Sequence, residues 1–252
     1  MAEWQNLKNP PVVTTVFQLK YNLEDTEVKL DDFLQFNNSL SRDFPSRRDD
    51  LETNITFPKS TKIPLGRSLV SGETNTHRVG YAYISHDNKE QLRITNKDVT
   101  FTSERDYEGW EKFMESVMKY IMILEPILSK LNISRTSIRY INQFQFVEFN
   151  DPSQYVKTLI TTSENGSLPY PLLKYGFKLT FDINNNIYSI VNQSVDKENN
   201  DNYIYIFDID VLNNTEYLYN KEQVVDLMLE LRDIKNKIFF SNITDKVIEL
   251  CN

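Results

Sequence analysis

The chain has 252 residues, of which 40% are hydrophobic and 25% are charged. This composition is typical of a globular protein and argues against disorder, and the length suits one large domain or two fused halves. The net charge of -8 disfavours a general electrostatic grip on nucleic acid, because the phosphates repel an acidic protein.

The first residues, the apolar stretches and the cysteine content together indicate in which cellular compartment the protein is expected. The segment from Met1 to Lys8 lacks the charged and apolar regions of a secretory signal. The longest strongly apolar stretch, around Tyr120 to Leu124, is too short to span a bilayer. Cys251 is the single cysteine, so no disulfide framework and no cysteine-based metal site are expected. These features predict a cytoplasmic protein without a membrane span, cofactor or metal.

The first half of the chain predicts a strand, a helix, three strands and a second helix. Apolar residues alternate from Val13 to Tyr21, as they do in a half-buried strand. A helix with apolar residues at helical spacing starts at Asp31 or Asp32 and stops at Pro45. The three strands and the second helix are expected at 78–85, 91–96, 99–103 and 110–131.

Two places in this half are irregular. Residues 45–75 show little periodicity, although Asn54 to Phe57 alternate and are consistent with an edge strand. Pro126 lies inside the apolar stripe of the second helix, so a kink or a division of the helix is expected there.

The same order of elements then recurs. A strand from Ile138 to Phe146 precedes a helix that Asp151 and Pro152 would open. Three strands follow at 175–183, 187–195 and 203–211, then a helix from about Lys221 and a short last helix near 244–250.

This recurrence predicts an α+β protein with an apparent duplication of a β-α-β-β-β-α unit. The halves are expected to span 1–133 and 134–252, tightly associated or joined as one continuous domain. Their antiparallel strands would form one or two curved sheets with the helices packed on one face. Chance recurrence of a common order of elements is the alternative.

Two groups of charged residues are candidates for a binding site. Arg135 and Arg139, with Lys130 nearby, form a basic cluster at the junction of the halves that could grip a phosphate or an acidic partner. Asp208 and Asp210 share one face of a strand and could bind a hard cation or do acid–base work. The alternatives are internal ion pairs and the polar face of a one-sided sheet. No short catalytic or phosphate-binding motif is present, so no catalytic residue is predicted.

Five groups of residues along the chain carry a family resemblance. They are Asn9-Pro10-Pro11-Val12-Val13, Tyr107 with Trp110 and Phe113, Arg139-Tyr140-Ile141-Asn142, Asp208-Ile209-Asp210, and Leu231, Ile238, Phe239, Thr244 and Asp245. Together they resemble a sporadically distributed bacterial family of uncharacterised proteins of about this length. The resemblance covers nearly the whole chain in order and implies no established activity, cofactor or catalytic residue. Leu92 to Phe101 depart from the stronger aromatic and Gln pattern of the family's middle strands.

The first functional hypothesis is a non-enzymatic protein-interaction module in a bacterial antiphage-defence or toxin–inhibitor system. An acidic surface could mask a basic protein partner, and a homodimer is expected because closed symmetric assembly is common. One alternative is a sensor that binds a small molecule or nucleotide in a cleft between the two halves. The other is a metal-dependent hydrolase or nuclease built on Asp208, Asp210 and Asp182.

Overall fold

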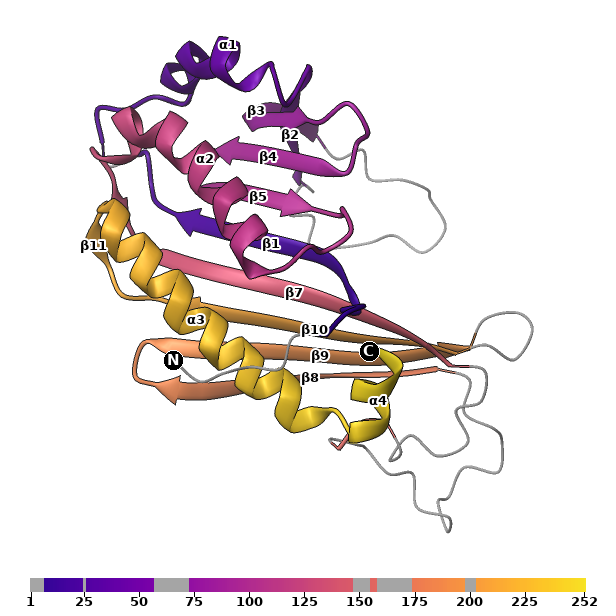
Figure 1. Cartoon of the computed structure of the whole chain (residues 1–252). Helices are drawn as coiled ribbons and strands as arrows, with labels where there is room; N and C mark the ends of the chain where they lie inside the picture. Colours follow the sequence, from indigo (N-terminus) through magenta and orange to yellow (C-terminus); the bar gives the residue numbers. More distant parts are fainter. Residues whose placement is uncertain (1–6, 25, 57–72, 147–154, 158–173, 198–202) are drawn as a thin grey trace, which may run out of the picture.

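A computed structural model describes residues 7–24, 26–56, 73–146, 155–157, 174–197 and 203–252 of the chain. Its centre is a nine-stranded sheet in the order β2-β3-β4-β5-β1-β7-β10-β9-β8, and every pair of neighbouring strands is antiparallel. This confirms the expected mixture of helices with a large antiparallel sheet (Figure 1).

The elements follow one another along the chain with these bounds. The first part contains β1 (Val12–Lys20), η1 (Leu30–Phe36), α1 (Asn37–Leu40), β2 (Ser46–Thr56), β3 (Glu73–Ile84), β4 (Glu90–Thr95), β5 (Asp98–Ser103) and α2 (Trp110–Leu128). The second part contains β6 (Asn132–Ile133), β7 (Arg135–Phe146), β8 (Lys174–Asn184), β9 (Ile187–Lys197), β10 (Tyr203–Asn213), β11 (Tyr217–Leu218), α3 (Lys221–Asn242) and α4 (Asp245–Leu250).

Strands β1 and β7 lie side by side at the middle of the sheet. Phe17 of β1 stands opposite Ile138 of β7 on one side and opposite Phe101 of β5 on the other. Outward from this pair, β5, β4 and β3 follow on one side, and β10, β9 and β8 follow on the other. The junction of the two parts of the chain is therefore a continuous ladder of hydrogen bonds.

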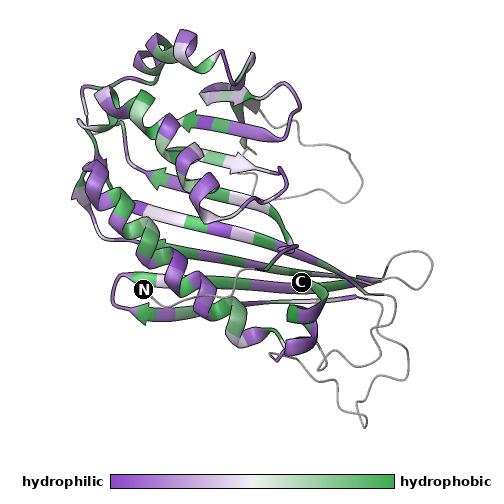
Figure 2. Ribbon diagram, in the orientation of Figure 1, coloured by the Kyte–Doolittle hydropathy of each residue, from purple (hydrophilic) through white to green (hydrophobic). Residues whose placement is uncertain are grey.

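The two long helices α2 and α3 lie on the same face of the sheet (Figure 1). Hydrophobic and hydrophilic residues alternate along the strands (Figure 2), because successive side chains of a strand point to opposite faces. The apolar side chains on the helix-covered face form one cluster that includes residues of both parts of the chain, among them Phe17, Tyr140, Phe207 and Leu231. We call the opposite side of the sheet the open face.

The structure differs from the sequence predictions at four places. A strand, β2, begins at Ser46, eight positions before the expected edge strand, and it includes the charged residues from Arg47 to Asp50. The helix expected from Asp31 to Pro45 is a 3-10 helix followed by a single turn of α-helix. Pro126 does not divide α2, which continues through it and ends two residues later. The helix expected at 151–160 lies mostly outside the described residues, and Val156 forms a β-bridge with Ile243 instead of a helical turn.

No helix among the described residues combines the length and the apolar character that crossing a bilayer requires.

Gly80 is a position in β3 where a side chain has no room. A Cβ atom there would clash with the carbonyl oxygen of Ile94 and would lie 2.9 Å from Cγ2 of Thr95. We therefore expect Gly80→Ala to lower the free energy of unfolding by about 1–3 kcal/mol, because a backbone atom cannot move aside cheaply. Gly176→Ala is the control, since its new Cβ would meet neighbours at ordinary contact distances of 3.5 and 3.6 Å. Equal losses in urea denaturation of the two variants would contradict this packing.

Candidate functional site

The four charged residues predicted as a site meet on the open face of β7 and β10. Arg139 donates two hydrogen bonds to Asp208, from Nε to Oδ1 and from Nη2 to Oδ2, each at 2.7 Å. Arg135 donates to Oδ2 of Asp210 at 3.0 Å. The cross-strand register places these residues together, since Arg139 stands directly opposite Asp210.

These four side chains are engaged with one another. Asn192 of β9 donates to Asp208 at 2.8 Å, so that buried carboxylate accepts three hydrogen bonds. Burial raises the pKa of Asp210 although Arg135 and Arg139 oppose the shift, and the hydrogen bonds to Asp208 raise the pKa of Arg139. The arrangement matches the alternative of internal ion pairs and leaves little charge for a ligand.

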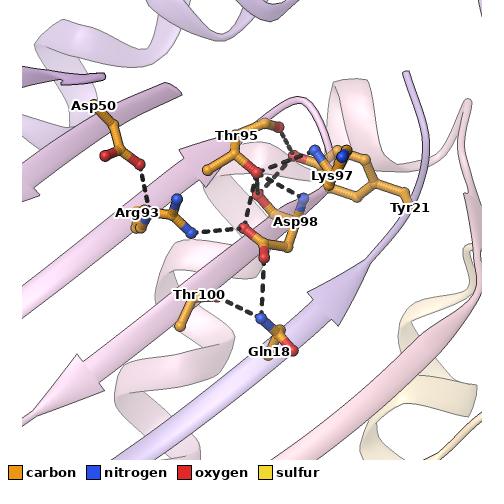
Figure 3. A network of polar contacts seen from close by, with 8 residues as sticks. All are labelled: Gln18, Tyr21, Asp50, Arg93, Thr95, Lys97, Asp98 and Thr100. Atoms are coloured by element: carbon orange, nitrogen blue, oxygen red, sulfur yellow. Dashed lines mark hydrogen bonds and ion pairs between the residues drawn. The ribbon is translucent and has the colours of Figure 1, made fainter. Parts of the chain in front are cut away.

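A second polar network lies on the open face at β1, β4 and β5 (Figure 3). Asp98 accepts hydrogen bonds from Nε2 of Gln18 at 3.0 Å and from Oγ1 of Thr95 at 2.9 Å. Arg93 lies 3.5 Å from Asp98 and 2.5 Å from Asp50, so it links β4 to the edge strand β2. Like the Arg139–Asp208 pair, this network fixes strands to one another.

The carboxylates proposed for metal chemistry do not converge. Asp182 lies on β8 opposite Tyr188, whereas β9 separates that strand from Asp208 and Asp210 on β10. Among the residues that the structure describes, no group of three or more His, Cys, Asp or Glu side chains is placed to hold a metal ion.

The helix-covered face contains a different candidate, a cleft of about 370 Å³ where the first turn of α2 meets α3. We call it the junction cleft. Its walls come from the N-terminal segment before β1, from α2 with the residues before it, and from the second half of α3. The residues used below are Lys8, Tyr107, Glu108, Gly109, Trp110, Glu111, Asn142, Arg232, Lys235 and Phe239.

Two cations of α3 line the junction cleft. The guanidinium of Arg232 lies 5.2 Å from the ring centroid of Trp110, and Nζ of Lys235 lies 4.2 Å from that of Tyr140. Neither cation forms an ion pair with a carboxylate in the described parts of the chain. Burial and the neighbouring Arg232 lower the pKa of Lys235 to about 7. The site therefore contains two cations whose close contacts in the described chain are aromatic rings instead of ion pairs.

Two buried polar side chains of β7 lie at the junction cleft: Asn142 lines it, and Tyr140 lies beneath it with its ring facing Lys235. The hydroxyl of Tyr140 is buried and has no hydrogen-bond partner among the described residues. Burial and then the neighbouring Tyr107 raise the pKa of Tyr140, so the hydroxyl stays protonated. Asn142 is also buried, and its Nδ2 donates to the carbonyl oxygen of Phe207 at 2.8 Å. An unsatisfied buried hydroxyl is costly, which is typical of sites that a ligand or water completes.

The remaining charges of the junction cleft nearly balance. Lys8 adds a third cation, and Glu108 and Glu111 add two carboxylates, so the formal charge of the lining is +1 in a protein of charge -8. Gly109, in the left-handed region with φ 111°, precedes α2 and supplies no side-chain cap. The first N–H groups of a long helix therefore add partial positive charge beside the cations.

A larger cavity of about 650 Å³ lies between α2 and the ends of β4 and β5. Its partly buried charges are paired, Glu90 with Arg105 at 3.1 Å and Asp43 with Lys119 at 2.6 Å. Because these ion pairs are internal, the larger cavity is the weaker candidate.

Sequence reasoning did not identify Arg232 and Lys235 as site residues. Yet segments on which the family resemblance rests contribute to the junction cleft, namely Pro10 to Val12, Tyr107 with Trp110, Asn142, and Phe239. Neither a protein-family model nor a curated protein matches the chain.

Proposed function

We propose that this protein binds a small organic anion in the junction cleft and acts as a ligand-binding sensor. The observation that carries the proposal is the pair of cations, Arg232 and Lys235, that face the cleft without carboxylate partners among the described residues. A carboxylate, sulfate or phosphate group supplies the negative charge that this lining lacks.

The size and lining of the cleft support a molecule larger than a bare ion. Its volume of about 370 Å³ lies within the usual range for small-molecule sites. Trp110 and Phe239 offer aromatic surface for an apolar or planar part of the ligand. Arg232 and Lys235 both line the cleft from α3, so the head group of the anion belongs on that side.

Native mass spectrometry of protein purified gently from its own host tests the proposal directly. A stoichiometric adduct of a few hundred daltons that Lys235→Met loses is the expected result. Purified protein with no adduct, and with a melting temperature that sulfate, phosphate and citrate leave unchanged, would overturn the proposal.

A sharper prediction concerns Lys235 and uses sulfate, whose charge is constant near neutral pH. We expect Lys235→Met to weaken sulfate binding about tenfold or more, because one charge-assisted contact is lost. Isothermal titration calorimetry of both proteins measures this change. Lys237→Met is the matched control, since Lys237 is an exposed lysine two positions further along α3.

The same site makes sulfate binding depend on pH. The anion favours the charged form of Lys235, whose pKa without ligand is about 7. Binding should therefore be strongest below pH 7 and weaken by up to tenfold per unit as the pH rises above it, with uptake of a proton on binding. A pH dependence that survives Lys235→Met would assign the titration to another group.

We also propose that the chain is a duplicated β-α-β-β-β-α unit with halves at 1–133 and 134–252. Support comes from the strand order, since β3-β4-β5-β1 on one side has its counterpart in β8-β9-β10-β7 on the other. Each set is followed by a long helix, α2 or α3. Under this proposal the junction cleft lies between equivalent helices of the two halves.

The hypothesis of an interaction module in an antiphage-defence or toxin–inhibitor system stays a prediction, as do membership of the bacterial family and the cytoplasmic location. The exposed edge strand β8 is the surface that supports binding to a protein partner.

A further inference from the structure

Strand β8 forms one edge of the nine-stranded sheet, at the lower end of the sheet in Figure 1. It pairs with β9 on one side, and no described strand pairs with the other. Phe181 is 42% exposed, and its neighbour two positions back, Leu179, is only partly buried. A long edge strand with exposed apolar side chains is a template for pairing with another strand.

Two charged residues of this edge have no ion-pair partner in the described structure. They are Lys178 and Asp182, both exposed and both on the open face of the sheet, with Thr180 midway between them. Their spacing of four residues places opposite charges at equal distances from Thr180.

From these observations we infer that β8 is a homodimer interface, at which it pairs antiparallel with β8 of a second copy about a twofold axis at Thr180. In this register Lys178 of each copy stands opposite Asp182 of the other, and Thr180 stands opposite its own counterpart. On the helix-covered face Leu179 of each copy stands opposite Phe181 of the other. These two contacts cover the exposed rings of Phe181. Cross-strand pairs of opposite charge and of apolar side chains are the ones that stabilise antiparallel sheets.

The charges also select this register against its neighbours. An axis at Lys178 would set that lysine against its own copy, and an axis at Asp182 would set two carboxylates against each other. Both arrangements put like charges in direct opposition, which is destabilising. An axis at any residue keeps the helices of both copies on one face, because directly opposed residues of an antiparallel pair point to the same side of the sheet. Among these axes, only the one at Thr180 sets Lys178 of each copy opposite Asp182 of the other.

A register-specific crosslink tests the interface. Cys251 is buried, and it is the single native cysteine. Thr180→Cys places two thiols across the axis, where paired Cα atoms are about 4.5–5.5 Å apart and a disulfide can form. Under mild oxidation we expect a disulfide-linked dimer from Thr180→Cys. Lys178→Cys is the control, because its two copies would lie about 13 Å apart, beyond the reach of a disulfide.

Charge reversal provides the second test, measured by sedimentation from about 1 to about 100 µM protein, where weak dimers are detected. Lys178→Asp alone and Asp182→Lys alone should each weaken dimerisation at least tenfold, whereas the double reversal should restore it. A wild-type protein that stays monomeric over this range would overturn the inference. So would a dimer that ignores both reversals and does not crosslink through Thr180→Cys. This interface shares no residue with the junction cleft.

Discussion

Replacing Arg139 with Met is expected to lower the free energy of unfolding by about 2–4 kcal/mol, since it leaves a buried carboxylate without its cation. The side chain of Asp208 is 6% exposed and would keep only the amide of Asn192 as a partner. The loss should stay below that of a fully buried pair, because the side chain of Arg139 is 43% exposed and water screens part of the interaction. Urea denaturation measures the change.

The matched control is Lys112→Met, which breaks an exposed ion pair with Glu115 at 3.1 Å and should change stability by less than about 0.5 kcal/mol. Adding Asp208→Asn should recover part of the loss. If the single variant is as stable as Lys112→Met, the pair does not stabilise the sheet.

The strands at the centre of the sheet were predictable because each buries one face. Alternation from Val13 to Tyr21 located β1, and the same pattern located β7 and β10. Strand β2 gave no such signal, because it is an edge strand with most of its described side chains exposed. Apolar and polar residues alternate along a strand only where one face of the strand is buried. The described side chains of β2 are buried on neither face, so charged residues such as Arg47 and Asp50 are tolerated in it.

The order of the strands in space did not follow from their order along the chain. The pairing of β1 with β7 joins residues about 120 positions apart, as in the pair Phe17 and Ile138. Alternation shows which face of a strand is buried and carries no information about the neighbour. The same restriction applies to Arg139 and Asp208, which were identified separately although they bind each other.

A sequence signal for the junction cleft did exist in α3. Its core-facing positions Val224, Met228 and Leu231 recur at steps of four and three, and the next steps of four reach Lys235 and then Phe239. A lysine at a core-facing position conflicts with the apolar pattern, and such conflicts tend to mark functional sites. Sequence alone could not show which groups would face Arg232 and Lys235, because Trp110 and Tyr140 come from α2 and β7.

Trp110→Ala should be among the most destabilising single changes, with a loss of about 3–5 kcal/mol, because it removes a large buried side chain. The indole is 7% exposed, its ring centroid lies 6.0 Å from that of Phe113, and the guanidinium of Arg232 lies over it. It thus links the first turn of α2 to α3. Chemical denaturation followed by circular dichroism measures the loss.

Met122→Ala is the control on the same helix, since Met122 is 53% exposed and its replacement should cost less than about 0.5 kcal/mol. A loss under about 1 kcal/mol for Trp110→Ala would contradict the packing of α2 against α3. Because Trp110 also lines the junction cleft, the variant should lose sulfate binding along with stability. Arg232→Met separates the two roles, because it removes the cation above the ring while the indole stays in the core. Weaker binding with a small loss of stability in Arg232→Met would show that the cations, and not the packing alone, make the cleft a binding site.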